Sequence, residues 1–161
     1  NFLYCKFMNN NSWRWYRQVA RTNTVLDFES HTFSHHDLTE SREGESRSAY
    51  RRRLFYELRF ARKELARYLK KDIRYLAYPY GVANETVTRL ARLSGYRAMF
   101  SALGGYVTDK SSPDKIPRFT IFRKFDHETF VAIVNGHWQR ERLPYPPRKD
   151  HIVPREYHFN F

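Results

Sequence analysis

Two histidines four positions apart, His31 and His35, are the residues of this sequence best suited to chemistry. They follow an apolar segment, 25–29, that has the pattern of a strand, and α/β folds gather functional groups where strands end. Two imidazoles at such an end can bind one metal ion through neutral ring nitrogens. A histidine pair by itself is also explained by ordinary hydrogen-bonded surface or core histidines, so both interpretations stay open at this point.

A second segment, 75–81, ends an apolar run in a turn built around Pro79. Tyr78 and Tyr80 flank this proline, and Gly81 follows. Backbone N–H groups in such a turn can point at a ligand oxygen. The same string is equally explained as a simple strand terminator.

Alternating apolar patterns predict the elements that must position these residues. We expect strands over 2–8, 25–29, 73–78, 96–101 and 117–122, and helices over 13–20, 50–68, 84–93 and 126–136. Asn84 and Asp126 are the expected N-caps of the last two helices. Strands that alternate with helices indicate an α/β fold with a largely parallel sheet or barrel.

The amino-acid composition limits which class of protein this can be and which kinds of molecule it could bind. The 161 residues are 41% hydrophobic, which suits one globular domain, and no apolar run approaches the roughly 20 residues needed to cross a bilayer. The single cysteine, Cys5, excludes an internal disulfide. Lysine and arginine number 29 against 17 acidic residues, a net charge of +12 that favours polyanions. The 50–68 helix carries a basic stripe on its other face, interpreted first as a solvated face and second as a polyanion-binding surface. The stripe consists of Arg51, Arg52, Arg59, Arg62, Lys63, Arg67 and Lys70.

The sequence resembles the NodB-type polysaccharide deacetylases, carbohydrate esterase family four, in five segments that occur in the same order. These segments are residues 28–38, 77–81, 94–97, 104–107 and 116–119. Within that family the sequence is most similar to the enzymes that act on poly-N-acetylglucosamine. The similarity runs from about Trp13 to Val134. It implies a distorted (β/α) barrel.

The resemblance also implies a set of site residues and a cofactor. One divalent metal, Zn²⁺ first and Co²⁺ or Ni²⁺ as alternatives, would be held by His31 and His35. The backbone N–H of Tyr80 would stabilise the oxyanion of the reaction. Thr32 takes the hydroxyl position of the histidine motif, and Tyr78 and Tyr80 are expected beside it at the substrate.

The sequence departs from the family at its first motif. No Asp-Asp pair occurs in the 161 residues, so the general base and the third metal ligand have no counterpart here. We therefore expect residues 1–136 to form a deacetylase-like domain that lacks its first strand, and the general acid is not assigned either. Residues 137–161, rich in proline and histidine, are expected to form an extended tail.

These observations give one leading function and two alternatives. The leading hypothesis is a metal-dependent hydrolase that removes N-acetyl groups from an N-acetylglucosamine polysaccharide such as a biofilm polymer. The resemblance places such an enzyme outside the cytoplasm, secreted or associated with the cell surface. The first alternative is a noncatalytic module of the same fold that binds glycan or a partner through aromatic residues, namely Trp13, Trp15, Tyr78, Tyr80 and Trp138. The second is a nucleic-acid-binding protein, for which no sequence-specific motif is present.

Overall fold

The computed structural model describes residues 12–123 and 125–137. In chain order the elements are α2 (Trp13–Thr22), α3 (Arg47–Phe55), the π-helical turn η1 (Tyr56–Phe60), α4 (Ala61–Leu69), β1 (Tyr75–Ala77), the 3-10 turn η2 (Pro79–Gly81), α5 (Glu85–Leu93), β2 (Ala98–Phe100) and α6 (His127–Val134). The α/β class expected from the sequence is confirmed. The expected strand 2–8 and the tail beyond His137 lie outside the described residues.

Side-chain caps start four of the helices. The side chains of Ser12, Ser46, Asn84 and Asp126 each accept a hydrogen bond from the backbone N–H three residues further on. Such caps satisfy N–H groups that have no partner inside the helix. The helices expected over 84–93 and 126–136, with Asn84 and Asp126 as their caps, are confirmed.

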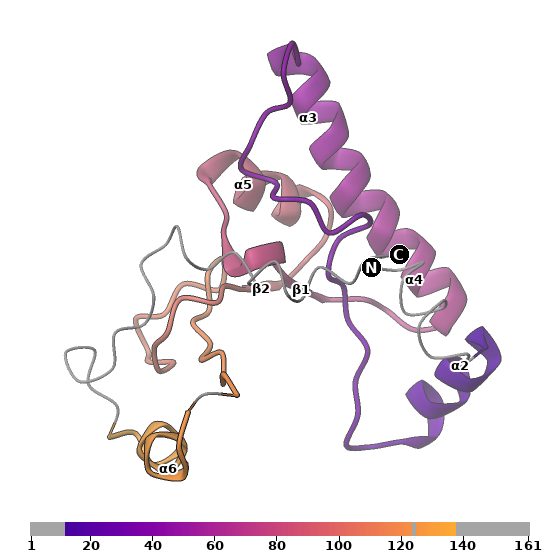
Figure 1. Ribbon diagram of the computed structural model, residues 1–161. Coiled ribbons are helices and arrows are strands. Elements are labelled where there is room, and N and C mark those ends of the chain that lie inside the picture. The colour runs from indigo at the N-terminus through magenta and orange to yellow at the C-terminus, as the bar shows by residue number, and fades with distance from the viewer. Residues whose placement is uncertain (1–11, 124, 138–161) are drawn as a thin grey trace.

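Helices α3, η1 and α4 follow one another without a break and form one long helix along a side of the molecule (Figure 1). Leu54, Leu58 and Leu69 from this helix are almost fully buried. Lys70 ends it in the left-handed conformation, with φ of 57°. The helix predicted from the 50–68 periodicity is therefore present, with a π-helical turn that the periodicity did not indicate.

The sheet consists of two short parallel strands extended by single bridges. β1 pairs with β2 in the register Leu76↔Met99. Ser30 adds a parallel bridge to Leu76 on one side, and Ile116 adds one to Phe100 on the other. Four segments of the chain thus lie parallel and side by side, in the order expected for the strands of an α/β barrel.

Two expected strands, 25–29 and 117–122, are wrong. Val25 is 87% exposed, and the Asn23 side chain accepts hydrogen bonds from the N–H groups of Val25 and Leu26 in place of a neighbouring strand. Pro117 follows the Ile116 bridge directly, and proline has no N–H to donate to a sheet. Only the residue beside each expected strand therefore pairs with the sheet.

The core lies between the long helix, the sheet and α5. Leu58, Ile73, Leu76, Val87 and Met99 are 0% exposed and belong to one hydrophobic cluster. Helix α2 covers the end of this cluster near α4 (Figure 1). Within the residues that the structure describes, no helix has the length and apolar character to cross a membrane.

Candidate active site

His31 and His35 lie together at the end of the segment that bridges to β1. Their ring centroids are 4.7 Å apart. The Nδ1 atom of His31 lies 2.7 Å from the Ala77 carbonyl oxygen at the end of β1, and since a carbonyl only accepts, Nδ1 carries the proton. Burial lowers the pKa of His31 and favours its neutral form. The remaining ring nitrogen, Nε2, is thereby left with the lone pair that binds a metal.

The loop that carries the two histidines has a strained backbone. Thr32 and His35 adopt left-handed conformations with φ of 66° and 60°. Such a conformation costs a residue other than glycine about 1–3 kcal/mol, so the surrounding structure must hold it in place. One such contact is internal, because the His35 N–H donates to Thr32 Oγ1 at 3.3 Å.

Glu57 holds the same loop from the long helix. This residue is 4% exposed, and its carboxylate accepts hydrogen bonds from the N–H groups of Phe33 at 3.1 Å and Ser34 at 2.9 Å. The Ser34 hydroxyl donates to the other carboxylate oxygen. Glu57 lies in η1, and π-helical turns occur often at functional sites. Sequence reasoning missed this residue, although an acidic residue three positions after Leu54 on an apolar helix face was a usable signal.

The turn after β1 brings Tyr80 to the histidine loop. The rings of Tyr80 and His35 are 5.1 Å apart, and Tyr80 has a left-handed φ of 55°. Gly81 follows with φ of 70°, and a Cβ there would lie 2.2 Å from the Ala102 nitrogen, so glycine is required. Among the described residues, no acceptor takes a hydrogen bond from the Tyr80 N–H. This N–H therefore has a free hydrogen to offer a ligand.

Thr32 and Tyr78 occupy more buried positions than a substrate contact needs. Thr32 is 3% exposed and shapes the loop through its bond with His35. Tyr78 is 1% exposed, its hydroxyl donates to the Asp114 carbonyl at 3.2 Å, and burial raises its pKa. The side chains of both residues support the site, and Tyr80 is the partly exposed one of the three expected substrate contacts.

The two histidines have no third metal-binding partner within the described part of the chain. Across residues 12–123 and 125–137, no group of three or more histidine, cysteine, aspartate or glutamate side chains is placed to hold a metal ion. His36 lies next to His35 but is exposed, with Nδ1 2.5 Å from Ser34 Oγ. The groups that could contact a metal or a ligand here are the imidazoles of His31 and His35 and the backbone N–H of Tyr80.

Comparison with known proteins identifies the family. Residues 2–99 match the family described as polysaccharide deacetylase, and the chain therefore belongs to this family. The chain is 30% identical over 97 residues to a poly-beta-1,6-N-acetyl-D-glucosamine N-deacetylase of Staphylococcus aureus strain MRSA252. That match covers 60% of this chain and 33% of the relative, so the chain spans about a third of the length of the curated relatives it matches.

Solved structures show the same fold. A de-N-acetylase from Aggregatibacter actinomycetemcomitans matches 76% of this chain and 53% of its own with a TM-score of 0.64 and 20% identity. IcaB from Ammonifex degensii matches 79% of this chain and 53% of its own, with a TM-score of 0.61 and 16% identity. The resemblance to deacetylases and the expected deacetylase-type α/β fold are both confirmed.

Proposed function

We propose that this chain carries two parts of the active site of a metal-dependent enzyme that removes N-acetyl groups from an N-acetylglucosamine polysaccharide. The observation that carries the proposal is the pair of imidazoles, 4.7 Å apart, beside the free N–H of Tyr80. The relatives named as poly-beta-1,6-N-acetyl-D-glucosamine N-deacetylases support this substrate class. Deacetylation of such a polymer, in a biofilm for example, would take place outside the cytoplasm, on a secreted or surface-associated protein.

The residues present fit a divalent metal in part. His31 offers Nε2 because the Ala77 carbonyl fixes its Nδ1 proton, and His35 offers a second imidazole beside it. Catalytic zinc sites use three protein ligands, and imidazole ligands also suit Co²⁺ and Ni²⁺. We assign neither the third ligand nor the general base to any residue that the structure describes. When bound, such a metal supplies a water of lowered pKa and polarises the amide carbonyl.

The chain's own residues then have separate tasks. The Tyr80 N–H donates to the oxygen that becomes negative as the amide carbonyl is attacked, which is where a fixed donor contributes most. The left-handed backbone at Thr32 and His35 aims the second imidazole, and Glu57 keeps that backbone in place. Aromatic residues beside the histidines, Tyr80 first, give the sugar ring a surface.

A noncatalytic glycan-binding module is the second candidate. The absence of a third metal-binding side chain among the described residues favours it. Of its expected aromatic contacts, Trp13 is stacked on Tyr68 at 4.6 Å and Tyr78 is buried, whereas Trp15 is 43% exposed. Trp138 lies outside the described residues.

Metal content and turnover of the full-length protein separate the two candidates. We expect bound Zn²⁺ by elemental analysis, and metal-dependent release of free amines from N-acetylglucosamine oligomers with added Zn²⁺ or Co²⁺. The changes His31→Ala and His35→Ala should remove both signals, because each deletes one of the two neighbouring imidazoles. His36→Ala should have a smaller effect, and His127→Ala, at the exposed start of α6, is the matched control.

Metal content that is unchanged in the His31→Ala/His35→Ala double variant contradicts the metal site, and glycan binding without turnover favours the second candidate.

A further inference from the structure

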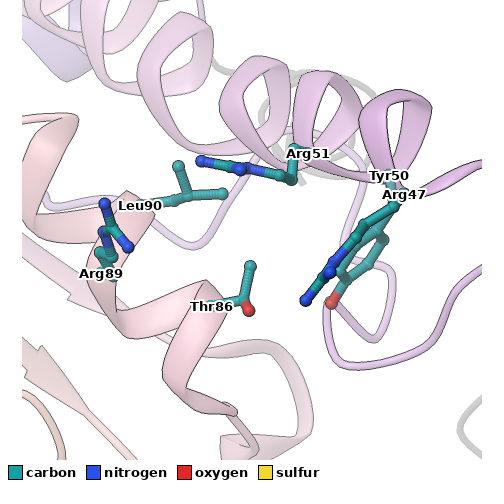
Figure 2. A pocket seen from close by; sticks show the side chains of 6 residues that line it. All are labelled: Arg47, Tyr50, Arg51, Thr86, Arg89 and Leu90. Atoms are coloured by element: carbon teal, nitrogen blue, oxygen red, sulfur yellow. The ribbon is translucent and has the colours of Figure 1, made fainter.

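A pocket lined by three arginines lies between α3 and α5. It encloses about 180 Å³ and is lined by Arg47, Tyr50, Arg51, Thr86, Arg89 and Leu90. Figure 2 shows Arg47 and Arg51 on α3 and Arg89 on α5, with Thr86 between them. None of these residues belongs to the histidine loop or to the Tyr80 turn. The pocket is therefore a separate feature of the surface.

The three guanidinium groups have no carboxylate partner in the described part of the chain. The ion pairs there involve other basic residues, for example Arg53 with Glu45 and Arg92 with Asp114. Glu45, two residues before Arg47 in the sequence, is already occupied by Arg53. Uncompensated like charges at i and i+4 on one helix, as at Arg47 and Arg51, destabilise that helix. The first turn of α3 contains no acidic residue that would offset them.

Tyr50 fixes the wall of this pocket. Its hydroxyl donates to the Leu38 carbonyl at 2.6 Å and accepts from Asn84 Nδ2 at 3.4 Å. Asn84 is the N-cap of α5, so this contact ties α3 to the start of α5. Tyr50 thus lines the pocket at a point where α3 contacts the start of α5, and buried Leu90 forms an apolar side.

We propose that this pocket binds a phosphate dianion, either as inorganic phosphate or as a phosphate monoester. Guanidinium groups recognise phosphate oxygens through paired, charge-assisted hydrogen bonds. Three such groups and the Thr86 hydroxyl supply donors from two helices. A dianion balances more of the accumulated positive charge than a carboxylate does. A single water needs roughly 10–15 Å³ of such a cavity, so the volume of about 180 Å³ admits a phosphate.

Calorimetric titration of the 161-residue chain at low ionic strength tests the proposal. The probes are inorganic phosphate, N-acetylglucosamine 6-phosphate and neutral N-acetylglucosamine. The triple variant Arg47→Gln/Arg51→Gln/Arg89→Gln should bind phosphate at least about tenfold more weakly, because it loses the charge-assisted bonds. Arg51→Lys keeps the charge but loses the paired donors, and should fall between the two.

A matched control removes the same charge elsewhere. Arg14→Gln/Arg21→Gln/Arg52→Gln changes three exposed arginines outside the pocket and should bind phosphate like the wild type. An equal loss in both triple variants would show a general effect of net charge and overturn the proposal, as would a wild type that binds no phosphate. Tighter binding of the sugar phosphate than of the free ion assigns the site to a monoester, and equal or weaker binding assigns it to inorganic phosphate. Circular dichroism of each variant verifies that it is folded.

Discussion

The Glu57 carboxylate is the group through which the long helix fixes the histidine loop. It accepts from two successive backbone N–H groups and from the Ser34 hydroxyl. Because these donors belong to the strained turn between His31 and His35, the position of the imidazoles depends on a residue that does not touch them. Glu57 is thus a positioning residue for the proposed metal site.

Removal of this carboxylate should destabilise the chain and loosen the metal site together. Glu57→Ala leaves two partly buried N–H groups without an acceptor, and we expect a loss of about 2–4 kcal/mol in the free energy of unfolding. Glu57→Gln keeps one acceptor oxygen and should lose roughly half as much. Urea unfolding measures the stability, and Zn²⁺ titration measures the affinity. Glu64→Ala is the control, since this partly exposed i,i+3 partner of the exposed Arg67 should contribute only about 0.2–0.5 kcal/mol. Equal stability of Glu57→Ala and Glu64→Ala would contradict the assigned role.

Sequence reasoning named three residues that the structure places close together, but not the residue that supports their loop. The histidine spacing and the turn after β1 led to His31, His35 and Tyr80, which the structure places side by side. Their roles with metal and oxyanion stay predictions. The apolar helix face could have marked Glu57 as buried, but it could not identify its partners, because these are backbone groups 23 and 24 residues away. The buried positions of Thr32 and Tyr78 likewise follow from tertiary packing.

At the scale of elements, an ion pair joins the loop before α3 to the helix itself. Arg53 donates to both carboxylate oxygens of Glu45 at 2.7 Å, and to the Glu40 carbonyl at 2.8 Å. The Arg42 N–H donates to the same carboxylate. The hydrogen bonds from Arg53, more than any other cause, lower the pKa of Glu45 from 4.5 to about 2. The charged form of Glu45 therefore stabilises the folded chain.

The contribution of Glu45 to the free energy of unfolding should consequently decrease as the pH is lowered. A carboxyl group with a lowered pKa in the folded state contributes its full stabilisation above its unfolded pKa. That contribution should be present above pH 4.5 and decline as the pH falls toward about 2. Urea midpoints of the wild type and Glu45→Gln, measured from pH 7 downward, should differ at neutral pH and converge in acid. A difference that persists unchanged at the acid end would show that Glu45 stabilises the fold by other means.

Helices proved easier to predict than strands because their signals are local. Capping side chains and an apolar period are written in consecutive residues, and the helices capped by Asn84 and Asp126 begin where they were expected. Strands depend on partners far along the chain. Val25 and Leu26 have strand-forming side chains, yet Asn23 takes their N–H groups. The π-helical turn η1, which contains Glu57 and so contacts a loop far along the chain, was likewise not indicated by the apolar period of its helix.

At the scale of the whole molecule, a net charge of +12 raises the question of polyanion binding along the long helix. Parts of its basic stripe are neutralised, because Arg62 pairs with Asp72 and Arg67 with Glu64. Aromatic rings on the same helix are engaged with each other or with arginine. Tyr56 and Phe60 stack at 4.6 Å, and Arg59 lies over the ring of Phe55 at 5.1 Å. The stripe thus offers charge and few open ring faces on which bases could stack.

Binding of DNA or RNA by this protein should therefore be purely ionic. We expect equal affinity for unrelated sequences, and a logarithmic slope of affinity against salt of about −0.9 per phosphate neutralised on duplex DNA. Fluorescence anisotropy with two scrambled duplexes, between roughly 50 and 200 mM salt, measures both quantities. The variant Arg52→Gln/Arg59→Gln/Lys63→Gln should flatten the slope, whereas the pocket variant Arg47→Gln/Arg51→Gln/Arg89→Gln shows how much of the effect the pocket carries. Tight binding that prefers one duplex and survives high salt would contradict an ionic mode and would favour nucleic acid over glycan as the partner.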